Sequence, residues 1–360
     1  MADFNKKLKL LQHFMSDWAG EPADAAGLVR ILNPRGSRPP LIWCFNGQNE
    51  FPMLAGDLGP DQPVIALRSL NLVARIEKGR PALDNRIADH YAELLLAAFD
   101  LSRCSVGGNC QGAPIAARIA ANLLRRGCVV ETVICMEWPS LSPLPIRCGL
   151  IFGAQSTMFN PFLQGLNPEP LWRALFADHR VEIIPGGHGE YFSEANHAAV
   201  GAAVARLLDP QWSAPKPADS RVMTVEPIAP PPSLPAASRA TIKVAIRSTS
   251  PAVATPRDRL SVGYVWISGD HGPSPAWGLQ PAPRGGSGRL SLKVETPGVE
   301  GEWDLYIFPT QEYGGPISWL ENHMPKCRIA IEKSTNDDAA RGWRRWLGHL
   351  RRLRPTGGEG

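Results

Sequence analysis

The residues best suited to do chemistry surround Cys110, which stands in a Gly-x-Cys-x-Gly pattern with Gly108 and Gly112. An apolar run precedes this pattern, and residues 113–126 follow it with apolar side chains at helical spacing. The sequence therefore predicts a strand that turns sharply into a helix, with a thiol at the apex. Glycine suits both flanking positions, because a Cβ there would crowd the strand or the helix. The positive end of a helix dipole favours a thiolate, which is the nucleophilic form of cysteine.

A nucleophilic thiol needs a base, and the base needs a group that orients it. His188 lies in the glycine-rich stretch 185–189, after an expected strand and before the last expected helix. The other histidines fall inside expected helices, directly before a strand, or beyond residue 209. We therefore expect His188 to be the base.

The orienting carboxylate can follow either of two strands. Glu137 directly ends the expected strand 129–136, whereas Ser156 occupies the corresponding position after Phe152. Glu137 is therefore the preferred residue, although its position equally fits a carboxylate at the rim of the site. Asp178 is a more distant alternative.

An oxyanion formed during acyl transfer needs hydrogen-bond donors beside the nucleophile. Gln111, the residue after the thiol, offers one backbone N–H, and residues 46–48, chiefly Asn46 or Gly47, offer another at the end of an expected strand. The sequence holds no Cys-x-x-Cys pair and no Cys/His ligand spacing. We therefore expect no metal, no redox cofactor and no disulfide framework, and reduced thiols in a cytoplasmic protein.

The elements that would position these residues alternate between strand and helix. Such alternation predicts an α/β fold, with a mostly parallel sheet that helices cover on both faces. Because catalytic groups in such sheets emerge from the carboxyl ends of the strands, Cys110, Glu137 and His188 would meet at one edge. We interpret residues 1–209 as one domain. Its expected strands are 27–32, 41–45, 64–68, 104–108, 129–136, 148–152 and 180–184, and its expected helices are 4–18, 86–98, 113–126, 168–176 and 194–208.

The chain changes character after residue 209. Residues 210–239 are rich in proline and are expected to form a semi-rigid linker. Residues 334–360 hold a basic amphipathic helix, which could pack on the protein itself, bind an anionic membrane or grip an acidic carrier protein. Residues 240–333 predict an antiparallel β-sandwich, with strands at 241–247, 260–268, 289–295, 303–308 and 327–332.

The overall composition describes a globular protein, with 44% hydrophobic and 20% charged residues. The net charge of +4 is too small to indicate nucleic-acid binding, because much of the excess lies in the C-terminal stretch. No apolar run is long enough to span a membrane, and the N-terminal residues lack the apolar core of a signal peptide. We expect a soluble protein.

The first domain resembles the thioesterase domains of nonribosomal-peptide and polyketide assembly lines, which belong to the α/β-hydrolase superfamily. This resemblance spans residues 27–208 and implies an α/β-hydrolase fold with a Cys110–His188–Glu137 triad. In that family the acid follows the strand after the elbow helix, which supports Glu137 over Ser156. The segments that carry the resemblance are 41–45, 61–70, 87–91, 106–112, 120–137 and 187–188.

The chain departs from that family in three ways. Cys110 replaces the usual serine, Glu137 replaces the usual aspartate, and the stretch from Glu137 to Cys148 leaves little room for the helical lid that the family commonly inserts there. Without a lid the cleft would be open, which suits a large acyl donor or acceptor. The β-sandwich resembles, more loosely, modules attached to polysaccharide-processing and export proteins.

Together these features indicate a thioesterase-like acyl hydrolase or acyltransferase in natural-product or polysaccharide biosynthesis. It would act on a thioester carried by an acyl or peptidyl carrier protein or by CoA, through an acyl group linked to Cys110. The only cofactor implied is the phosphopantetheine or CoA of the acyl donor. The alternative is a non-catalytic protein, in which the hydrolase scaffold and the β-sandwich bind a glycan or protein partner.

Overall fold

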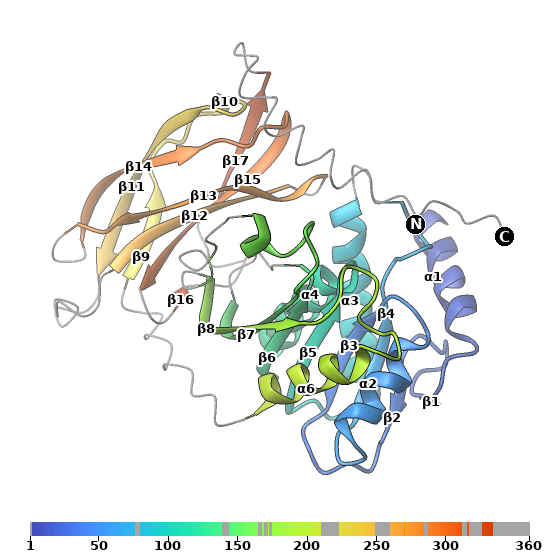
Figure 1. The fold of residues 1–360 in the computed structure, drawn as a ribbon. Helices are drawn as coiled ribbons and strands as arrows, with labels where there is room; N and C mark the ends of the chain where they lie inside the picture. Colours follow the sequence, from blue (N-terminus) through green and yellow to red (C-terminus); the bar gives the residue numbers. More distant parts are fainter. Residues whose placement is uncertain are drawn as a thin grey trace. The chain divides into compact units, whose positions relative to one another are not determined.

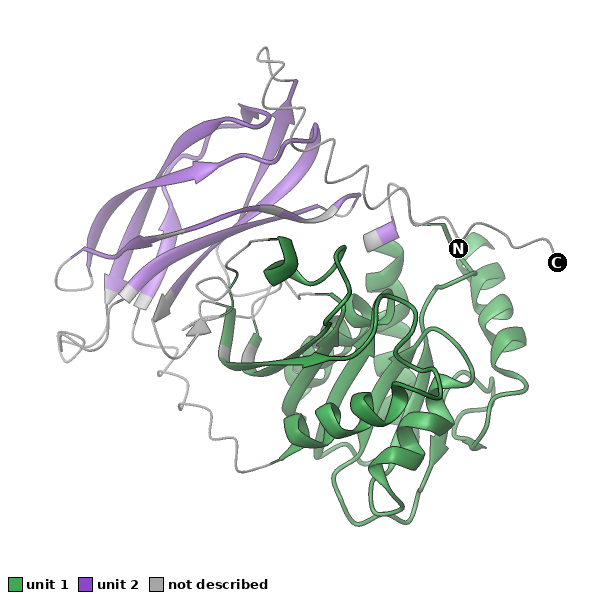
Figure 2. Ribbon diagram, in the orientation of Figure 1, with its two compact units in different colours: residues 1–75, 82–217, 313–316 green, residues 76–81, 218–312, 317–360 purple. Residues whose placement is uncertain are grey.

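The computed structural model forms two compact units, shown in green and purple in Figure 2. The first unit comprises residues 1–75, 82–217 and 313–316, and the second comprises 76–81, 218–312 and 317–360. The helix expected in residues 334–360 lies outside the described residues. The structure describes residues 2–75, 80–138, 144–164, 168, 172, 175–209, 223–248, 260–268, 270–283, 287–311, 315–316 and 326–333.

Among the described residues, the first unit is built around one eight-stranded sheet of order β1-β2-β4-β3-β5-β6-β7-β8 (Figure 1). From β4 to β8 in this order all neighbours pair in parallel, whereas β1 and β2 pair antiparallel at one edge. The expected mostly parallel sheet is therefore mixed. Its strands are β1 (Glu21–Pro22), β2 (Arg30–Leu32), β3 (Leu41–Phe45), β4 (Val64–Arg68), β5 (Arg103–Asn109), β6 (Val129–Met136), β7 (Leu144–Gly153) and β8 (Phe176–Ile184).

The helices of the first unit cover both faces of this sheet. Residues in register on parallel strands point to the same face, and Gly107, Ile134 and Gly149 are in register. A Cβ on Gly149 would meet Leu207, which belongs to the last helix. A Cβ on Gly108, which points to the opposite face, would lie 2.6 Å from a backbone oxygen at the start of the helix after β5. The helices are α1 (Ala2–Met15), α2 (Glu50–Leu58), α3 (Arg80–Ala98), α4 (Gly112–Arg125), the 3-10 helix η1 (Pro161–Gln164) and α6 (His197–Leu208).

Side-chain contacts pair the helices on each face. On one face, His197 of α6 and Asp57 of α2 lie 2.9 Å apart. On the other face, Asn122 of α4 donates a hydrogen bond of 2.7 Å to Asp89 of α3. None of the described helices combines the length and the apolar character needed to cross a membrane.

Helix α2 was not expected from the sequence. It contains Pro52 and Gly56, which both disfavour helix interiors. Pro52 lies in the first turn, however, where the missing N–H has no intrahelical partner to lose. Residues 46–49, after the end of β3, therefore lead directly into a helix.

Several other element boundaries also differ from the expected ones. β7 begins at Leu144 rather than at residue 148, and β8 begins at Phe176 rather than at residue 180. Both strands are therefore longer than the apolar runs from which they were predicted. The last helix begins at His197 rather than at residue 194. The helix expected over residues 168–176 falls mostly outside the described residues, and Phe176 belongs to β8.

The described part of the second unit consists of strands in two sheets, of orders β10-β17-β15-β12-β13 and β14-β11-β9. Buried side chains from both sheets share one hydrophobic core, among them Ile242 of one sheet and Trp266 and Trp303 of the other. Gly315–Pro316 (β16) belongs to the first unit. The strands of the second unit are β9 (Met223–Pro227), β10 (Ser233–Pro235), β11 (Arg239–Ser248), β12 (Leu260–Ser268), β13 (Gly272–Pro281), β14 (Gly288–Glu295), β15 (Gly301–Gln311) and β17 (Lys326–Glu332).

Three strands of the second unit were not expected from the sequence. β9 and β10 lie within residues 210–239, so these two stretches are strands rather than linker, and β13 contains Pro273 and Pro275. Each of the three ends its sheet in the strand order. Proline lacks an N–H and is tolerated at a sheet edge, where one side of the strand needs no partner.

Candidate active site

Cys110 stands at the apex between β5 and α4. Its φ of +47° lies in the left-handed region, which non-glycine residues rarely adopt. The Cys110 N–H donates to the carbonyl of Met136 at 2.8 Å, and the Cys110 carbonyl accepts from the N–H of Ala113 at 3.1 Å. A Cβ on Gly112 would overlap the carbonyl oxygen of Cys44. Close packing beneath the apex therefore holds the thiol in a strained conformation, as at many functional turns.

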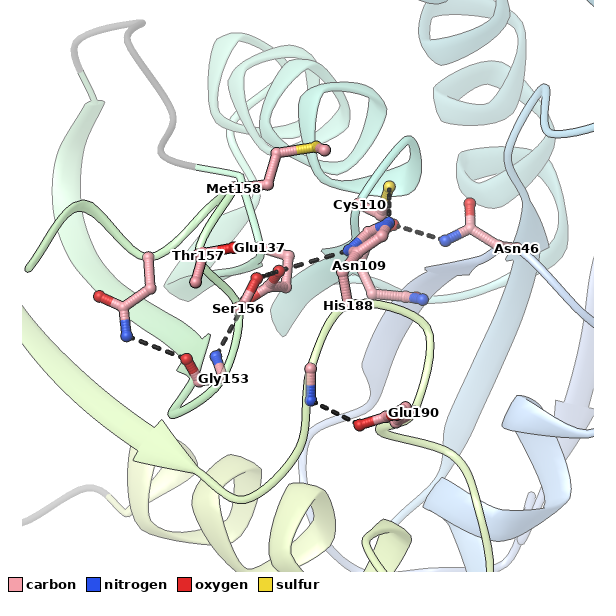
Figure 3. A network of polar contacts seen from close by, with 12 residues as sticks. Asn46, Asn109, Cys110, Glu137, Gly153, Ser156, Thr157, Met158, His188 and Glu190 are labelled. Atoms are coloured by element: carbon pink, nitrogen blue, oxygen red, sulfur yellow. Dashed lines mark hydrogen bonds and ion pairs between the residues drawn. The ribbon is translucent and has the colours of Figure 1, made fainter. Parts of the chain in front are cut away.

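Three residues from three loops form a line at this edge of the sheet (Figure 3). The Sγ of Cys110 lies 3.6 Å from Nε2 of His188, and Nδ1 of His188 lies 3.3 Å from Oε2 of Glu137. The three follow β5, β8 and β6 respectively, at the carboxyl ends of the strands. The arrangement has the geometry of a nucleophile, a base and an orienting acid.

The carboxylate of Glu137 is part of the interior and not of the rim. Its side chain is 1% exposed, and its φ is +57°. Oε1 accepts the N–H of Gly153 at 2.9 Å, and Oε2 accepts the hydroxyl of Ser156. A buried carboxylate needs such donors, because an unsatisfied charge in the interior is costly. Ser156, the alternative position for the acid, thus lies against Glu137 instead of replacing it.

Asp178 lies elsewhere. It is near the start of β8, where it is in register with Arg147 of β7. At a strand rise of about 3.3 Å per residue, Asp178 is about 20 Å from the end of β8 at Ile184. It is therefore far from the edge that carries Cys110 and does not orient His188.

The loop that carries His188 is held by side chains on both sides. The Gly187 N–H donates to Oε2 of Glu190 at 2.8 Å, and the Gly186 N–H donates to Oε1 of Gln155 at 2.6 Å. The ring of Phe159 lies 4.5 Å from the imidazole, centroid to centroid. Gln155 and Phe159 follow β7, so the loop after the neighbouring strand fixes the base.

The protonation of His188 reflects its two partners. Burial lowers the pKa of His188, but its hydrogen bonds to Cys110 and Glu137 and the charges of these groups raise it, and the net result is a pKa of about 9. At neutral pH the imidazole is therefore protonated and faces the sulfur.

The loop expected to complete the oxyanion hole is already engaged. The Asn46 N–H donates to Oε2 of Glu50 at 2.9 Å, and the Gly47 N–H is also hydrogen-bonded to this carboxylate. The expectation that either N–H serves the oxyanion is therefore not supported by the resting geometry. Gln111, at the N-terminal end of α4, stays the predicted donor.

A buried polar network that the sequence did not indicate lies beneath the apex. Asn109, the residue before the nucleophile, donates from Nδ2 to Glu50 at 3.2 Å and accepts at Oδ1 from Nε1 of Trp43 at 3.1 Å. Its carbonyl accepts from Nδ2 of Asn46 at 3.0 Å. Burial raises the pKa of Glu50, and the donors around the carboxylate oppose this effect. The network ties α2 and β3 to the elbow, and the only signal for it in the sequence is the polar residue next to Cys110.

We expect Ser156→Ala to slow alkylation of Cys110 by iodoacetamide at neutral pH by about tenfold. The hydroxyl fixes the oxygen of Glu137 that faces His188, and a hydrogen bond to a charged group contributes about 1.5–3 kcal/mol. The matched control is Thr157→Ala, because Thr157 is the exposed neighbour. If Ser156 acts through the acid, Ser156→Ala has no further effect in a Glu137→Gln background. Additive losses in the double variant would contradict this role.

The other side-chain chemistry of the described residues is limited. No group of three or more His, Cys, Asp or Glu residues among them is placed to hold a metal ion. All seven cysteines are free, and only Cys110 and Cys128 are partly exposed. Burial raises the pKa of the Cys128 thiol, although Arg126 opposes the effect. Cys128 is thus an internal control, with whose rate of alkylation the rate at Cys110 can be compared.

No protein-family model and no curated protein matches the chain. Solved structures match about half of it. The NocB thioesterase domain, in covalent complex with a fluorophosphonate nocardicin G analogue, is 17% identical over 51% of this chain and 100% of its own, with a TM-score of 0.39. The type II thioesterase of the yersiniabactin NRPS/PKS pathway is 13% identical over 52% and 100%, with a TM-score of 0.38. A thioesterase of prodiginine biosynthesis in Streptomyces coelicolor is 15% identical over 48% and 89%, with a TM-score of 0.36. At these scores the likeness does not decide the function of this chain.

Proposed function

We propose that the first unit is a thioesterase-like acyl hydrolase or acyltransferase of the α/β-hydrolase type. It takes an acyl group from a thioester on a carrier protein or on CoA and holds it on Cys110. One observation carries this proposal: a thiol on a strained backbone, an imidazole and a buried carboxylate lie in line, at 3.6 Å and 3.3 Å, at the carboxyl edge of the parallel part of the sheet. A structural cysteine would need none of these three features.

The geometry supports a two-step mechanism. In the first step the thiolate of Cys110 attacks the thioester carbonyl, and the N–H of Gln111 is the proposed donor to the oxyanion. The intermediate then expels the donor thiolate, which takes the proton of the His188 imidazolium. In the second step neutral His188 accepts a proton from the attacking water, amine or thiol, and Cys110 leaves as a thiolate. Glu137 orients the imidazole throughout.

A sulfur nucleophile makes transfer at least as favourable as hydrolysis. The acyl group moves from one thioester to another, so the first step is nearly neutral in energy. Compared with an oxygen ester, the resulting thioester prefers amines and thiols over water as acceptors. A carrier protein is therefore the proposed partner, and a cytoplasmic location, where donor thiols stay reduced, fits this chemistry.

For the second unit we infer a β-sandwich, because its two sheets share one core. That this β-sandwich binds a glycan or a protein is a separate proposal, which the proposed enzymatic function does not require.

Intact-mass measurement of the full chain after incubation with acyl-CoA and acyl-pantetheine thioesters tests the proposed function. We expect a mass increase of one acyl group, located by peptide mapping at Cys110 and absent from Cys128. Hydroxylamine should remove the adduct, since it cleaves thioesters. Failure of every thioester to acylate Cys110, in protein whose Cys110 still alkylates at neutral pH, would refute the function while leaving the reactive thiol in place.

A further inference from the structure

Leu72, in the loop after β4, combines two unfavourable features. Its φ is +65°, a left-handed conformation that costs a non-glycine residue roughly 1–2 kcal/mol. Its side chain is also 71% exposed, the largest exposure among the exposed large hydrophobic residues of the described chain. Neither local propensity nor burial explains a leucine here. Strain that persists at an exposed apolar residue points to a function.

The surrounding loop imposes this conformation. The Asn71 N–H donates to the hydroxyl of Ser69 at 3.1 Å, and the Asn71 carbonyl accepts from the guanidinium of Arg68 at 3.1 Å. The N–H groups of Val73 and Ala74 both donate to the carbonyl of Leu70 at 3.0 Å. Hydrogen bonds on both sides of Leu72 thus fix the backbone and project its side chain outward.

The same loop is bonded to the elbow. Nε2 of Gln111, the residue after the nucleophile, donates to Oδ1 of Asn71 at 3.1 Å. Leu72 is therefore the next residue in the chain after Asn71, which is hydrogen-bonded to the elbow residue Gln111. In the sheet order β5 lies between β4 and β7, so the loops after β4 and β7 flank Cys110 on opposite sides.

The loop after β7 also carries apolar side chains. Phe159 packs against the imidazole of His188, and Phe162 and Leu163 are 41% and 50% exposed. Phe159 therefore lies beside the imidazole of His188, and exposed apolar side chains occur in the loops after both β4 and β7. A charged or strongly polar acyl group would lose hydration beside these side chains without gaining a partner.

We propose that Leu72 contacts the acyl group on Cys110, and that this acyl group is apolar, of the alkanoyl class. The proposal rests on the proposed function, because it names the substrate class of the same site. Leu72 acts as a specificity residue and takes no part in the chemical steps.

N-alkylmaleimides provide the first test, because they label Cys110 without any enzymatic acyl transfer. In the wild type we expect N-octylmaleimide to label Cys110 faster than N-ethylmaleimide. Leu72→Asn keeps the left-handed backbone, which asparagine tolerates, and removes the apolar side chain. We expect it to lower the octyl-to-ethyl rate ratio by at least about fourfold, the effect of one methylene that loses its contact.

The controls separate contact from strain. Ala229→Gly changes another exposed residue with positive φ, at +44°, in the second unit, and should leave the ratio unchanged. Leu72→Asn should have a melting temperature equal to or above that of the wild type, because the strain is relieved. An octyl-to-ethyl rate ratio in Leu72→Asn equal to that of the wild type would overturn the role of Leu72, even if both reagents reacted more slowly.

Acyl-CoA thioesters provide the second test. The wild type should form the octanoyl adduct faster than the acetyl adduct, and Leu72→Asn should lose this preference. If no thioester acylates Cys110, the proposed function fails. If thioesters acylate it with no preference for the longer chain, the proposed function stands and the apolar substrate class is refuted.

Discussion

We expect the variant Cys110→Ala to form no acyl adduct with any thioester and to have no turnover above background. Alanine keeps the backbone but removes the sulfur to which the acyl group binds, so neither step can begin. Intact-mass measurement and an assay of thiol release from acyl-CoA check this result. The matched control is Cys128→Ala, which removes the other partly exposed thiol and should leave both readouts unchanged.

The variant Cys110→Ser provides a second test of the acyl group on residue 110. Serine keeps the fold, because it is smaller than cysteine and the apex is open to solvent on one side. It would form an oxygen ester, so product analysis should show a higher ratio of hydrolysis to transfer than in the wild type. Full activity in Cys110→Ala, or unchanged partitioning in an active Cys110→Ser, would mean that the elbow does not carry the acyl group.

We expect the variant His188→Ala to lose at least about a hundredfold in acyl transfer, because a positioned acid and base contributes roughly 10²–10⁴-fold. Glu137→Gln keeps the size of the side chain and removes only the charge. Its loss in acyl transfer should be smaller than that of His188→Ala, at about ten- to a hundredfold relative to the wild type. The reason is that His188 takes part in each proton transfer, whereas Glu137 only orients it. Rates with the thioester that acylates the wild type fastest would measure both losses. A larger loss in Glu137→Gln than in His188→Ala would reverse these roles.

The pH dependence tests the charge state of the same pair. Because the pKa of His188 is raised to about 9, the imidazolium is present at neutral pH and is lost as the pH rises through about 9. Acyl transfer should therefore fall on the alkaline side near pH 9, and His188→Ala should lack this limb. The contribution to stability has the same sign: it is complete below the unfolded pKa of about 6.5 and disappears as the pH passes about 9. Thermal unfolding of both proteins between pH 6 and pH 10 measures this difference.

The line formed by Cys110, His188 and Glu137 was predictable because each member carries a local signal. Cys110 lies between two glycines whose spacing predicts a strand–turn–helix. Glu137 directly follows a strand, and His188 lies in the glycine-rich loop after another. Parallel strands then bring these three residues to one edge whatever the loop lengths are. The sequence could not decide whether Glu137 was buried, since its burial depends on Gly153, which ends the neighbouring strand, and on Ser156, which follows it.

The contacts of the expected oxyanion donors Asn46 and Gly47 with Glu50 could not be predicted, for a physical reason of the same kind. The backbone N–H of Asn46 has no sequence signal for its acceptor, and Glu50 reaches it only because α2 begins immediately after the turn. Helix α2 was itself hidden by a proline in its first turn. The missed strands of the second unit likewise contain or adjoin prolines, which only the position at a sheet edge makes acceptable. The predictions thus failed where tertiary context overrides local propensity.

The position of β8 has a consequence for how the site responds to partial unfolding. β8 ends the strand order of the sheet, and it leads directly into the loop that carries His188. Cys110, by contrast, follows β5, which has neighbours on both sides. Edge elements open at lower free energy than the centre of a sheet, through sub-global fluctuations. We therefore expect His188 to belong to a less protected cooperative unit than Cys110, so that mild denaturation separates the two while Cys110 keeps its place in the folded elbow.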